Sequence, residues 1–424
     1  MNKAMKYSGV EWLGKIPHDW EVLKAKRIFK LKNEKNSELK PLLSVSKGRG
    51  LLLREEMVNR PTHAQKNIET FKLVGDGDFV IHLRSFQSGF ELSSIEGAVS
   101  PAYTVFNARK NDEVCNKYYK YIFYSKPFID KIASTTLSLR DGKPISYDDF
   151  SITLLPVPNY IEQQKIAAFL DEKVSHIDNI IEDTKKSIEN LKTYKQSLIT
   201  ETVTKGLDPN IEMKDSGIEW IGDIPNNWSV IPLKYISSLN DENLSNKTSE
   251  DYSFKYVDIG SVSFENGIEQ MEETNFKSSP SRARRIVRKN DIIISTVRTY
   301  LKAIALIKES NDIIVSTGFA VVRPKNYLVD PLFLSYSLKS DYFTEKVRAY
   351  SYGIAYPSIN STEIATMEIV LPPKSIQIEI ACFLRERIFQ IDSLINEKDK
   401  LITKLESYKK SLIYEYVTGK KEVK

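Results

Sequence analysis

The sequence of this chain repeats itself, and no other feature constrains its fold as strongly. Residues 6–22 read KYSGVEWLGKIPHDWEV and residues 214–230 read KDSGIEWIGDIPNNWSV, with ten identities in seventeen positions. All four tryptophans of the chain fall in these two segments and in the same register: Trp12, Trp20, Trp220 and Trp228. The chain is therefore a duplication, and its halves are expected to fold alike.

A second pair of matching segments lies later in each half. Residues 158–179 read PNYIEQQKIAAFLDEKVSHIDN, and residues 372–393 read PPKSIQIEIACFLRERIFQIDS. Between the matching segments the similarity falls to a pattern of apolar residues. The order along the chain is thus a variable block, a helical block, a variable block and a helical block.

Each helical block carries a long amphipathic pattern. In residues 161–204, Ile177, Thr184, Leu191 and Leu198 lie at seven-residue steps, which form an imperfect heptad repeat. Prolines precede each pattern and Gly206 follows the first, as at the ends of helices. A helix of this span would extend about 60 Å. We expect the two stripes to pair as a coiled coil, although both could instead be core helices of one domain. The residues predicted to make this pairing are Ile177, Ile181, Leu191, Tyr194, Leu198, Ile391, Leu394, Leu405, Tyr408 and Leu412.

The two variable blocks, at about residues 20–155 and 228–370, have the pattern of strand-rich domains. Short β-branched and aromatic runs separated by Gly, Pro, Asn and Asp predict strands at 78–83, 103–106, 292–296, 313–315 and 319–322. Each block also contains a helical stretch, at residues 116–126 and 331–339. The expected fold class is α+β, with domains at residues 1–155 and 211–370 that alternate with helical regions at 156–210 and 371–424.

Several classes of function find no support in the sequence. Four scattered histidines and two cysteines, Cys115 and Cys382, do not supply the ligands of a metal site. Residues 9–15 match the start of a phosphate-binding loop, but Ile16 stands where that loop needs Ser or Thr. We find no catalytic set, which favours binding over catalysis. The absence of a long apolar run and of a signal peptide predicts a cytoplasmic protein without membrane contact.

Basic residues cluster in the variable blocks, although the net charge of +5 is small for 424 residues. Arg and Gln can read guanine and adenine edges, and Lys neutralises phosphate, so these clusters favour DNA. Arg284, Arg285 and Arg288 are expected to share one helix face; the alternative is an ordinary solvated face. The predicted DNA-binding residues are Lys47, Arg49, Arg54, Arg84, Gln87, Arg140 and Lys143 in the first block, and Arg282, Arg284, Arg285, Arg288, Arg298, Tyr300, Lys302, Arg348, Tyr352 and Tyr356 in the second.

Three segments resemble a known family. MKDSGIEWIGDIPNNW at residues 213–228, the LPVP and IEQQKIAAFLDEK stretches at 155–173, and YVTGK at 416–420 are similar to the specificity subunits of type I restriction–modification systems. The resemblance covers essentially the whole chain, including the alternation of two variable domains with two repeated helical regions.

The resemblance implies a non-catalytic chain with two target-recognition domains, each reading one half of a bipartite, asymmetric sequence in double-stranded DNA. It implies that the two helical regions pack antiparallel, separate the domains and dock two modification (methyltransferase) subunits, which restriction and translocase subunits then join. S-adenosylmethionine, ATP and magnesium would bind those partners. One departure is that Arg385-Glu386 replaces Asp171-Glu172 of the first copy, so the two docking faces need not be equivalent.

Other classes of function remain open from the residues alone. The chain could be the specificity chain of a type II split-site restriction–modification enzyme, which would have one fused cutting and modifying partner. It could be an enzyme acting alone, which would need a catalytic constellation in a cleft. It could also be a coiled-coil linker without DNA affinity, which steep salt-dependent DNA binding would exclude. The duplication itself favours a duplex read at two separated half-sites, because a pseudo-two-fold protein matches such a site.

Overall fold

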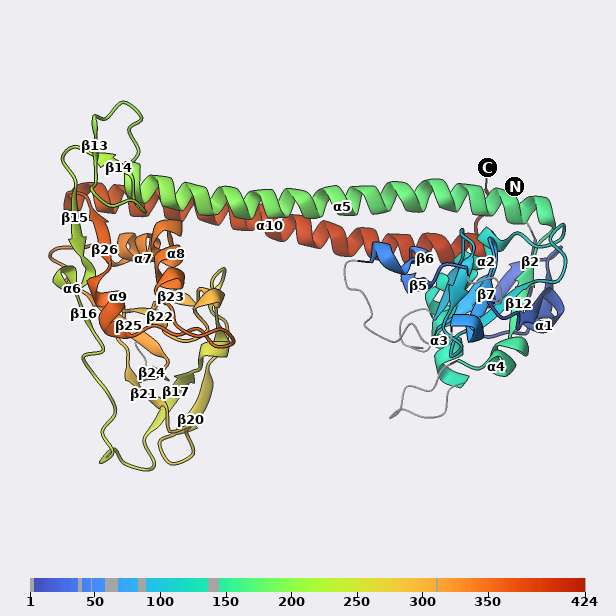
Figure 1. Cartoon of the computed structure of the whole chain (residues 1–424), viewed down its shortest axis with the longest axis horizontal. Coiled ribbons are helices and arrows are strands. Elements are labelled where there is room, and N and C mark those ends of the chain that lie inside the picture. Colours follow the sequence, from blue (N-terminus) through green and yellow to red (C-terminus); the bar gives the residue numbers. More distant parts are fainter. Residues whose placement is uncertain are drawn as a thin grey trace. The chain divides into compact units, whose positions relative to one another are not determined.

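The computed structural model describes residues 4–36, 40–46, 48–57, 68–82, 89–135, 145–309 and 312–423. The chain forms two compact units: the first unit contains Met1–Thr184 and Asp399–Lys424, and the second contains Lys185–Lys398. Two long helices, α5 (Tyr160–Lys205) and α10 (Lys374–Val417), each contribute one segment to each unit (Figure 1). Each unit therefore combines a strand-rich domain with a pair of helix segments.

The first unit is built on a four-stranded antiparallel sheet in the order β4-β11-β8-β9. Its strands are β4 (Phe29–Lys32), β11 (Thr104–Ala108), β8 (Phe79–Ile81) and β9 (Phe90–Leu92). Three helices, α2 (Asn116–Tyr124), α3 (Lys126–Thr135) and α4 (Tyr147–Ser151), pack on the sheet through a core of phenylalanines. The remaining elements are β1 (Met5–Tyr7), β2 (Lys15–Pro17), β3 (Glu21–Lys24), α1 (Ala25–Ile28), β5 (Leu43–Ser46), β6 (Gly50–Leu53), β7 (Lys72–Val74), β10 (Gly97–Val99) and β12 (Leu154–Val157).

The second unit has the equivalent sheet and a second sheet, whose counterpart in the first unit is the strand pairs β5-β6 and β7-β10, joined by a parallel bridge between Leu42 and Ala98. The order β16-β25-β22-β23 is formed by β16 (Ser237–Leu239), β25 (Phe319–Pro324), β22 (Ile292–Ser295) and β23 (Ile304–Leu306). A second sheet, β20-β17-β24-β21, is formed by β20 (Glu272–Asn275), β17 (Ser253–Val257), β24 (Ile313–Ser316) and β21 (Ala283–Ile286). The remaining elements are β13 (Met213–Asp215), β14 (Asp223–Pro225), β15 (Ser229–Pro232), α6 (Leu233–Ile236), β18 (Val262–Ser263), β19 (Gly267–Ile268), α7 (Pro331–Lys339), α8 (Asp341–Ala349), α9 (Ser361–Thr366) and β26 (Glu368–Leu371).

The duplication is visible in the topology even where the sequences have diverged. A two-stranded antiparallel ribbon, β3 with β12 or β15 with β26, joins the start and the end of each domain. Each ribbon leads into one short helix and then into the four-stranded sheet, and each sheet is followed by two consecutive helices. The predicted α+β class is therefore confirmed. The strands and helices predicted from apolar runs also form, for example β22 at Ile292–Ser295 and α7 at Pro331–Lys339.

A glycine follows the end of each long helix, and at Gly206 this end was predicted from the sequence. Gly206 follows α5 with φ +81° and Gly419 follows α10 with φ +68°, a conformation that favours glycine. Within the first unit the rings of Phe169 and Tyr416 lie 4.5 Å apart. Further along α5, Asp178 pairs with Lys409, which comes earlier in α10 than Tyr416, so the two segments run antiparallel within this unit.

Most of the predicted pairing residues are buried or partly buried. Ile177, Ile181, Leu405 and Leu412 belong to the core of the first unit or pack against it, Leu198 packs against the core of the second, Ile391 is buried and Leu191 is partly buried. Tyr194, Leu394 and Tyr408 are 57%, 47% and 56% exposed, and their part in the pairing stays a prediction.

Candidate nucleic-acid interface

The basic run at residues 282–288 is not helical: Arg284 and Arg285 lie on β21 (Ala283–Ile286), Arg282 lies in the turn before it and Arg288 follows it. β21 pairs with β24, so the prediction that Arg284, Arg285 and Arg288 share one helix face is wrong. The backbone hydrogen bonds to β24, together with the burial of Ala283 and Val287, favour the extended form. Successive side chains of a strand point to opposite faces, so this run does not present one continuous basic surface.

The arginines of this run are engaged within the second unit. The contacts are Arg282–Asp258 at 3.7 Å, Arg284 over the Phe276 ring at 4.7 Å, Arg285–Asn243 at 3.2 Å, and Arg288–Glu242. Arg282 and Arg288 keep exposed side chains, but each already has a carboxylate partner. Contact with a DNA phosphate would therefore have to compete with these ion pairs.

The remaining predicted residues of the second block converge on one surface. Thr299 Oγ1 lies 2.8 Å from Ser351 Oγ, and the backbone of Val297 forms a bridge with Ser358. These contacts join two loops that lie about fifty residues apart in the sequence. We call the result the two-loop surface, and its members are Arg298, Tyr300, Lys302, Arg348, Tyr352 and Tyr356.

The electrostatics of the two-loop surface are basic. The Arg298 guanidinium lies over the Tyr356 ring, 5.4 Å from its centroid. Lys302 and Arg348 both pair with Glu345, at 2.9 and 3.2 Å. Among the described residues of this surface, the three cations Arg298, Lys302 and Arg348 therefore have only the Glu345 carboxylate to balance their charge. An arginine stacked on an exposed tyrosine suits a phosphate backbone and a base face at the same time.

In the first block the structure describes two of the predicted residues. Arg49 is exposed in the turn between β5 and β6, and Arg54 is half-buried just after β6. The Nε of Arg54 is buried and has no hydrogen-bond partner among the described residues. The other predicted residues of this block, Lys47, Arg84, Gln87, Arg140 and Lys143, lie outside the described residues.

A buried glutamate that the sequence analysis missed holds the turn that carries Arg49. Glu91 on β9 is fully buried and accepts hydrogen bonds from the backbone N–H groups of Gly48, at 2.9 Å, and Gly50, at 3.2 Å. It also accepts one from the hydroxyl of Tyr124. Burial raises the pKa of Glu91, although these donors act in the opposite direction. A lone Glu gives no signal of such a contact in the sequence, since its partners lie over thirty residues away.

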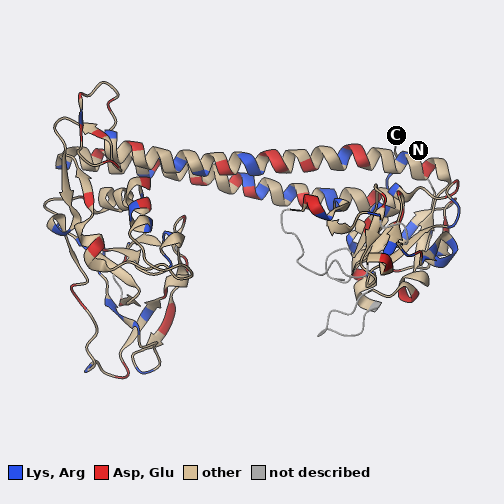
Figure 2. Cartoon of the chain, viewed as in Figure 1, with Lys and Arg blue, Asp and Glu red and all other residues tan. Residues whose placement is uncertain are grey.

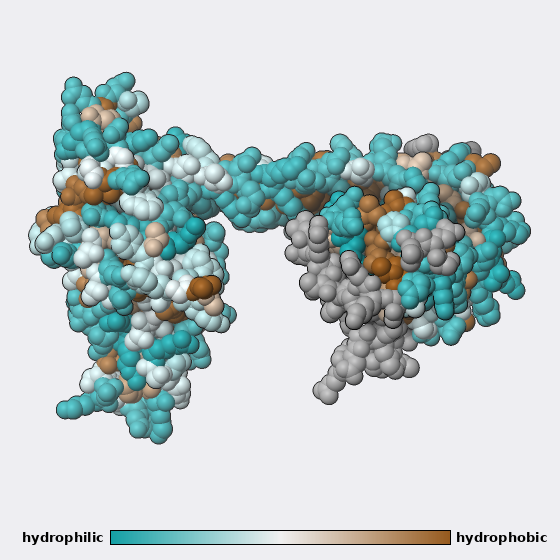
Figure 3. All heavy atoms as spheres, viewed as in Figure 1, coloured by the Kyte–Doolittle hydropathy of each residue, from teal (hydrophilic) through white to brown (hydrophobic). Residues whose placement is uncertain are grey.

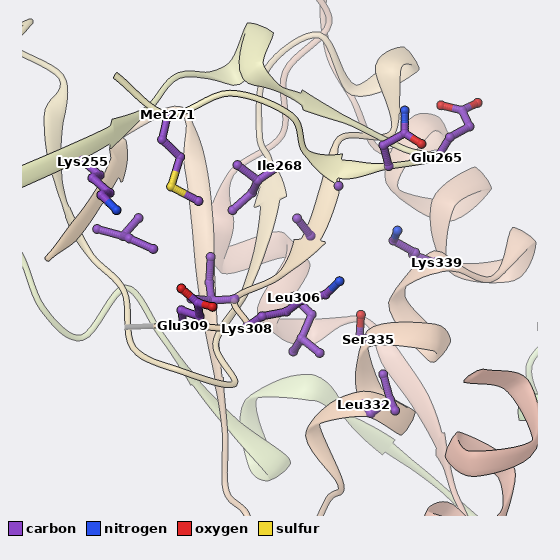
Figure 4. Close-up of a pocket in the computed structure, with 15 residues that line it drawn as sticks. Lys255, Glu265, Ile268, Met271, Leu306, Lys308, Glu309, Leu332, Ser335 and Lys339 are labelled. Carbon is purple, nitrogen blue, oxygen red and sulfur yellow. The ribbon is translucent and has the colours of Figure 1, made fainter. Parts of the chain in front are cut away.

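The second unit also contains a pocket of about 430 Å³ between β19, β23 and α7 (Figure 4). Ile268, Met271 and Leu306 form apolar walls, and Lys339 reaches in from α7. The Lys339 ammonium donates to the carbonyl oxygen of Phe264 at 3.0 Å. Burial, followed by repulsion from Lys195, lowers the pKa of Lys339 to about 8. The lining mixes apolar side chains with charges of both signs and contains no paired nucleophile and base.

Two kinds of feature were sought among the residues that the structure describes: a cluster of metal-binding side chains and a membrane-spanning helix. No group of three or more His, Cys, Asp or Glu side chains could hold a metal ion among these residues. Within the same ranges, no helix is both long and apolar enough to span a bilayer. Figure 2 shows Lys and Arg alternating with Asp and Glu along α5 and α10, so these helices do not form a surface of one sign.

Comparison with known proteins agrees with the architecture. Residues 225–406 match the family model described as type I restriction modification DNA specificity domain. The chain is 25% identical to the type I restriction enzyme MjaVIII specificity subunit of Methanocaldococcus jannaschii, over 97% of this chain and 95% of that protein. It is 22% identical to the EcoBI specificity subunit of Escherichia coli, over 73% of this chain and 68% of that protein.

Two solved structures have a similar fold. A chain from a study of complex assembly and conformational transition of the type I restriction–modification system has a TM-score of 0.72 at 14% identity. The HsdS subunit of Thermoanaerobacter tengcongensis has a TM-score of 0.54 at 14% identity. Each comparison covers 95% of this chain and 98% of the other. In its sequence this chain is similar to type I restriction–modification specificity subunits, and its duplicated strand-rich domains and repeated long helices give it the fold of the two solved structures.

Proposed function

We propose that the domains at residues 1–155 and 211–370 are two target-recognition domains, each reading one half of a bipartite, asymmetric sequence in double-stranded DNA. The observation that carries this proposal is the repeated topology with diverged surfaces. Both domains have the same four-stranded sheet and ribbon, and the second sheet β20-β17-β24-β21 has a counterpart in the first unit, where a parallel bridge between Leu42 and Ala98 joins the pairs β5-β6 and β7-β10; the sequences on these matching scaffolds differ. Two similar scaffolds with different surfaces suit two different half-sites.

The residues that contact DNA are, in this proposal, the exposed members of the two-loop surface in the second unit and Arg49 in the first. Four arginines are weaker candidates, because each would have to break a contact within the unit before it could contact DNA: Arg282, Arg284, Arg285 and Arg288. Arg54 and the five predicted residues outside the described ranges remain candidates from their sequence alone.

The helical regions at 156–210 and 371–424 would dock two modification subunits, and restriction and translocase subunits would then join. The support is a set of apolar side chains on these helices that no part of the described chain covers. Phe389 is 74% exposed, and Tyr194 and Tyr408 are more than half exposed. Large exposed apolar side chains on a charged helix are typical of a surface that meets a partner.

A specificity subunit is itself non-catalytic, and the cofactors of the reaction reside in partner subunits. In the proposed complex, S-adenosylmethionine serves the modification subunits, and ATP and magnesium serve the restriction subunits. The complex would act on DNA in the cytoplasm.

The test is a domain exchange read by methylation mapping. The full chain carries residues 211–370 of another family member and is assembled with its own modification subunits. The methylated positions are then mapped on genomic DNA. We expect one half of the recognised sequence to change and the other to stay the same. A change in both halves, or in neither, would contradict two independent readers.

A further inference from the structure

The loop that follows α8 leaves a large apolar side chain, that of Ile354, fully exposed to solvent. Five consecutive residues, 352–356, are exposed, and Ile354 at their centre is fully exposed. Tyr352 and Tyr356 on either side are 67% and 69% exposed. Single exposed apolar residues are ordinary, but a contiguous group marks a contact surface.

This loop is nevertheless closed at its base. Tyr352 and Ser358 exchange two backbone hydrogen bonds, of 2.8 and 2.9 Å. Gly353 has φ +105°, and a Cβ added there would lie 3.2 Å from the carbonyl oxygen of Tyr356. The loop is thus a short, defined turn with an apolar tip, at the edge of the second unit (Figure 1). A tip held in this way loses little conformational entropy when it enters a binding partner.

The neighbouring loop adds strain and more exposed apolar surface. Arg298 and Lys302 both have left-handed backbone conformations, with φ of 51° and 48°, on either side of the single turn at Thr299–Leu301. Non-glycine residues in this region are strained, and such strain concentrates at functional sites. The turn presents Tyr300 and Leu301, which are 53% and 43% exposed. Figure 3 shows brown, hydrophobic atoms among hydrophilic ones on the surface of the second unit.

The basic side chains near the loop tip indicate which class of partner the tip binds. Arg298 has no carboxylate partner among the described residues, and Lys302 and Arg348 share Glu345. An apolar tip that carries Arg298 over its Tyr356 ring does not suit a second protein core, which would leave this guanidinium buried without a carboxylate. It suits duplex DNA, where phosphates pair with the cations and the base stack accepts an apolar side chain.

We propose that Ile354 is a wedge that enters a base-pair step of the half-site read by the second recognition domain. Tyr352 and Tyr356 lie against the sugars and bases on either side of that step, and Arg298 contacts a flanking phosphate. The inference rests on the proposed function and names the side chain and its mode of contact. Isoleucine is among the side chains that proteins insert between base pairs, where it partly unstacks and kinks the duplex.

A second mode of apolar contact would need no unstacking. Ile354 could lie against the methyl group of a thymine in the major groove. The wedge predicts a local loss of stacking that is independent of that methyl group. The methyl contact predicts normal stacking and a loss of affinity when thymine is replaced by uracil. These opposite expectations separate the two modes.

The experiment uses the full chain assembled with its modification subunits and a duplex that contains the mapped target. 2-Aminopurine replaces one adenine at a time across both half-sites, except at the methylated adenines, because a methyltransferase flips its target base out of the stack. We expect its fluorescence to rise at one step of the half-site read by residues 211–370. Ile354→Ala should abolish that rise and weaken binding about tenfold. Ile354→Phe, which can still fill a base step, should keep the rise, and Tyr327→Ala, at an exposed tyrosine outside the two loops, should behave like the wild type.

Three outcomes would overturn the wedge: no fluorescence rise in that half-site with the wild-type complex, a rise that survives Ile354→Ala, or a loss of affinity on uracil substitution with normal stacking. None of them concerns the division of the half-sites between the domains. If exchange of residues 211–370 leaves both half-sites unchanged, the proposed function fails, whatever Ile354 does.

Discussion

The ammonium of Lys195 on α5 lies 2.6 Å from a carboxylate oxygen of Asp392 on α10. The same pair occurs in the first unit with the roles of the helices exchanged, because Lys409 on α10 pairs with Asp178 on α5. Both lysines and both aspartates are related by the 214-residue offset of the repeat. The duplication has therefore preserved an ion pair that joins the two helices once in each unit.

We expect this pair to be worth little but to be measurable. The Lys195 side chain is 15% exposed and that of Asp392 is 47% exposed, so solvent screens the attraction. Lys195→Ala should lower the free energy of unfolding by about 0.5–1 kcal/mol. A double-mutant cycle with Asp392→Ala, measured by urea unfolding, should give a coupling of similar size. The same cycle on the exposed pair Lys192–Glu189 is the control and should give less; equal couplings would contradict the prediction.

A buried glutamine at the start of each helix should matter much more. Gln377 accepts a hydrogen bond from the Asp330 N–H at 2.7 Å and donates to the carbonyls of Leu328 and Pro372. Gln163 makes the same three kinds of bond in the first unit. Gln377→Leu leaves these backbone groups without a partner and should cost about 2–4 kcal/mol of stability.

The control for this substitution is Gln390→Leu on the same helix, where the side chain is exposed. It should change the free energy of unfolding by less than about 0.5 kcal/mol. Similar losses for the two variants would mean that the buried amide does not anchor the helix to the domain.

Glycines at the ends of the long helices should resist substitution to different degrees. A Cβ added at Gly419 would lie 2.5 Å from Pro17 and 2.9 Å from Trp20, whereas one at Gly206 would lie 3.1 Å from Trp228. Gly217 has a similar positive φ but open space around it. Gly217→Ala therefore measures only the cost of placing a Cβ in a left-handed backbone conformation, about 1–2 kcal/mol of stability.

Thermal unfolding should therefore rank the alanine variants of Gly419, Gly206 and Gly217 from most to least destabilised. Gly419→Ala should lose about 1–3 kcal/mol beyond the backbone penalty, because the ring carbons must move. Equal losses at Gly419 and Gly217 would show that the helix end does not pack closely on the tryptophan–proline segment.

Lys339 should make stability depend on pH in the alkaline range. Its pKa is lowered to about 8 in the folded chain from an ordinary 10.5. Between these two values the unfolded state binds more protons than the folded state, so the free energy of unfolding should rise with pH across this window. Lys339→Met should flatten that rise, whereas Lys339→Arg, which stays charged, should remain less stable throughout the window. Identical pH profiles for the wild type and Lys339→Met would rule out this assignment.

Salt dependence should distinguish the free arginine of the two-loop surface from an ion-paired one. If Arg298 neutralises a phosphate, Arg298→Ala should reduce the slope of log K against log salt by about 0.9. Arg288 is already paired with Glu242, so Arg288→Ala should change the slope less. Titrations of the assembled complex with target duplex at several salt concentrations provide the measurement, and equal changes in slope would contradict the ranking.

The sequence by itself determined the architecture of this protein. The tryptophan segments and the paired 158–179 and 372–393 segments established the duplication, and the apolar periodicity located both long helices. Gly206 correctly predicted that α5 ends at the residue before it, Lys205. These features could be predicted because periodicity, proline and glycine act on residues close to one another in the chain.

The tertiary structure alone decided where the candidate interface lies. Arg284 and Arg285 are on a strand because β24, some thirty residues later, supplies hydrogen bonds and an apolar neighbour. Arg298 and Tyr356 meet because two loops share a short bridge, and Glu91 reaches Gly48 and Gly50 across the first domain. Each of these contacts joins residues far apart in the sequence, and its energy exists only once the chain has closed the loop between them.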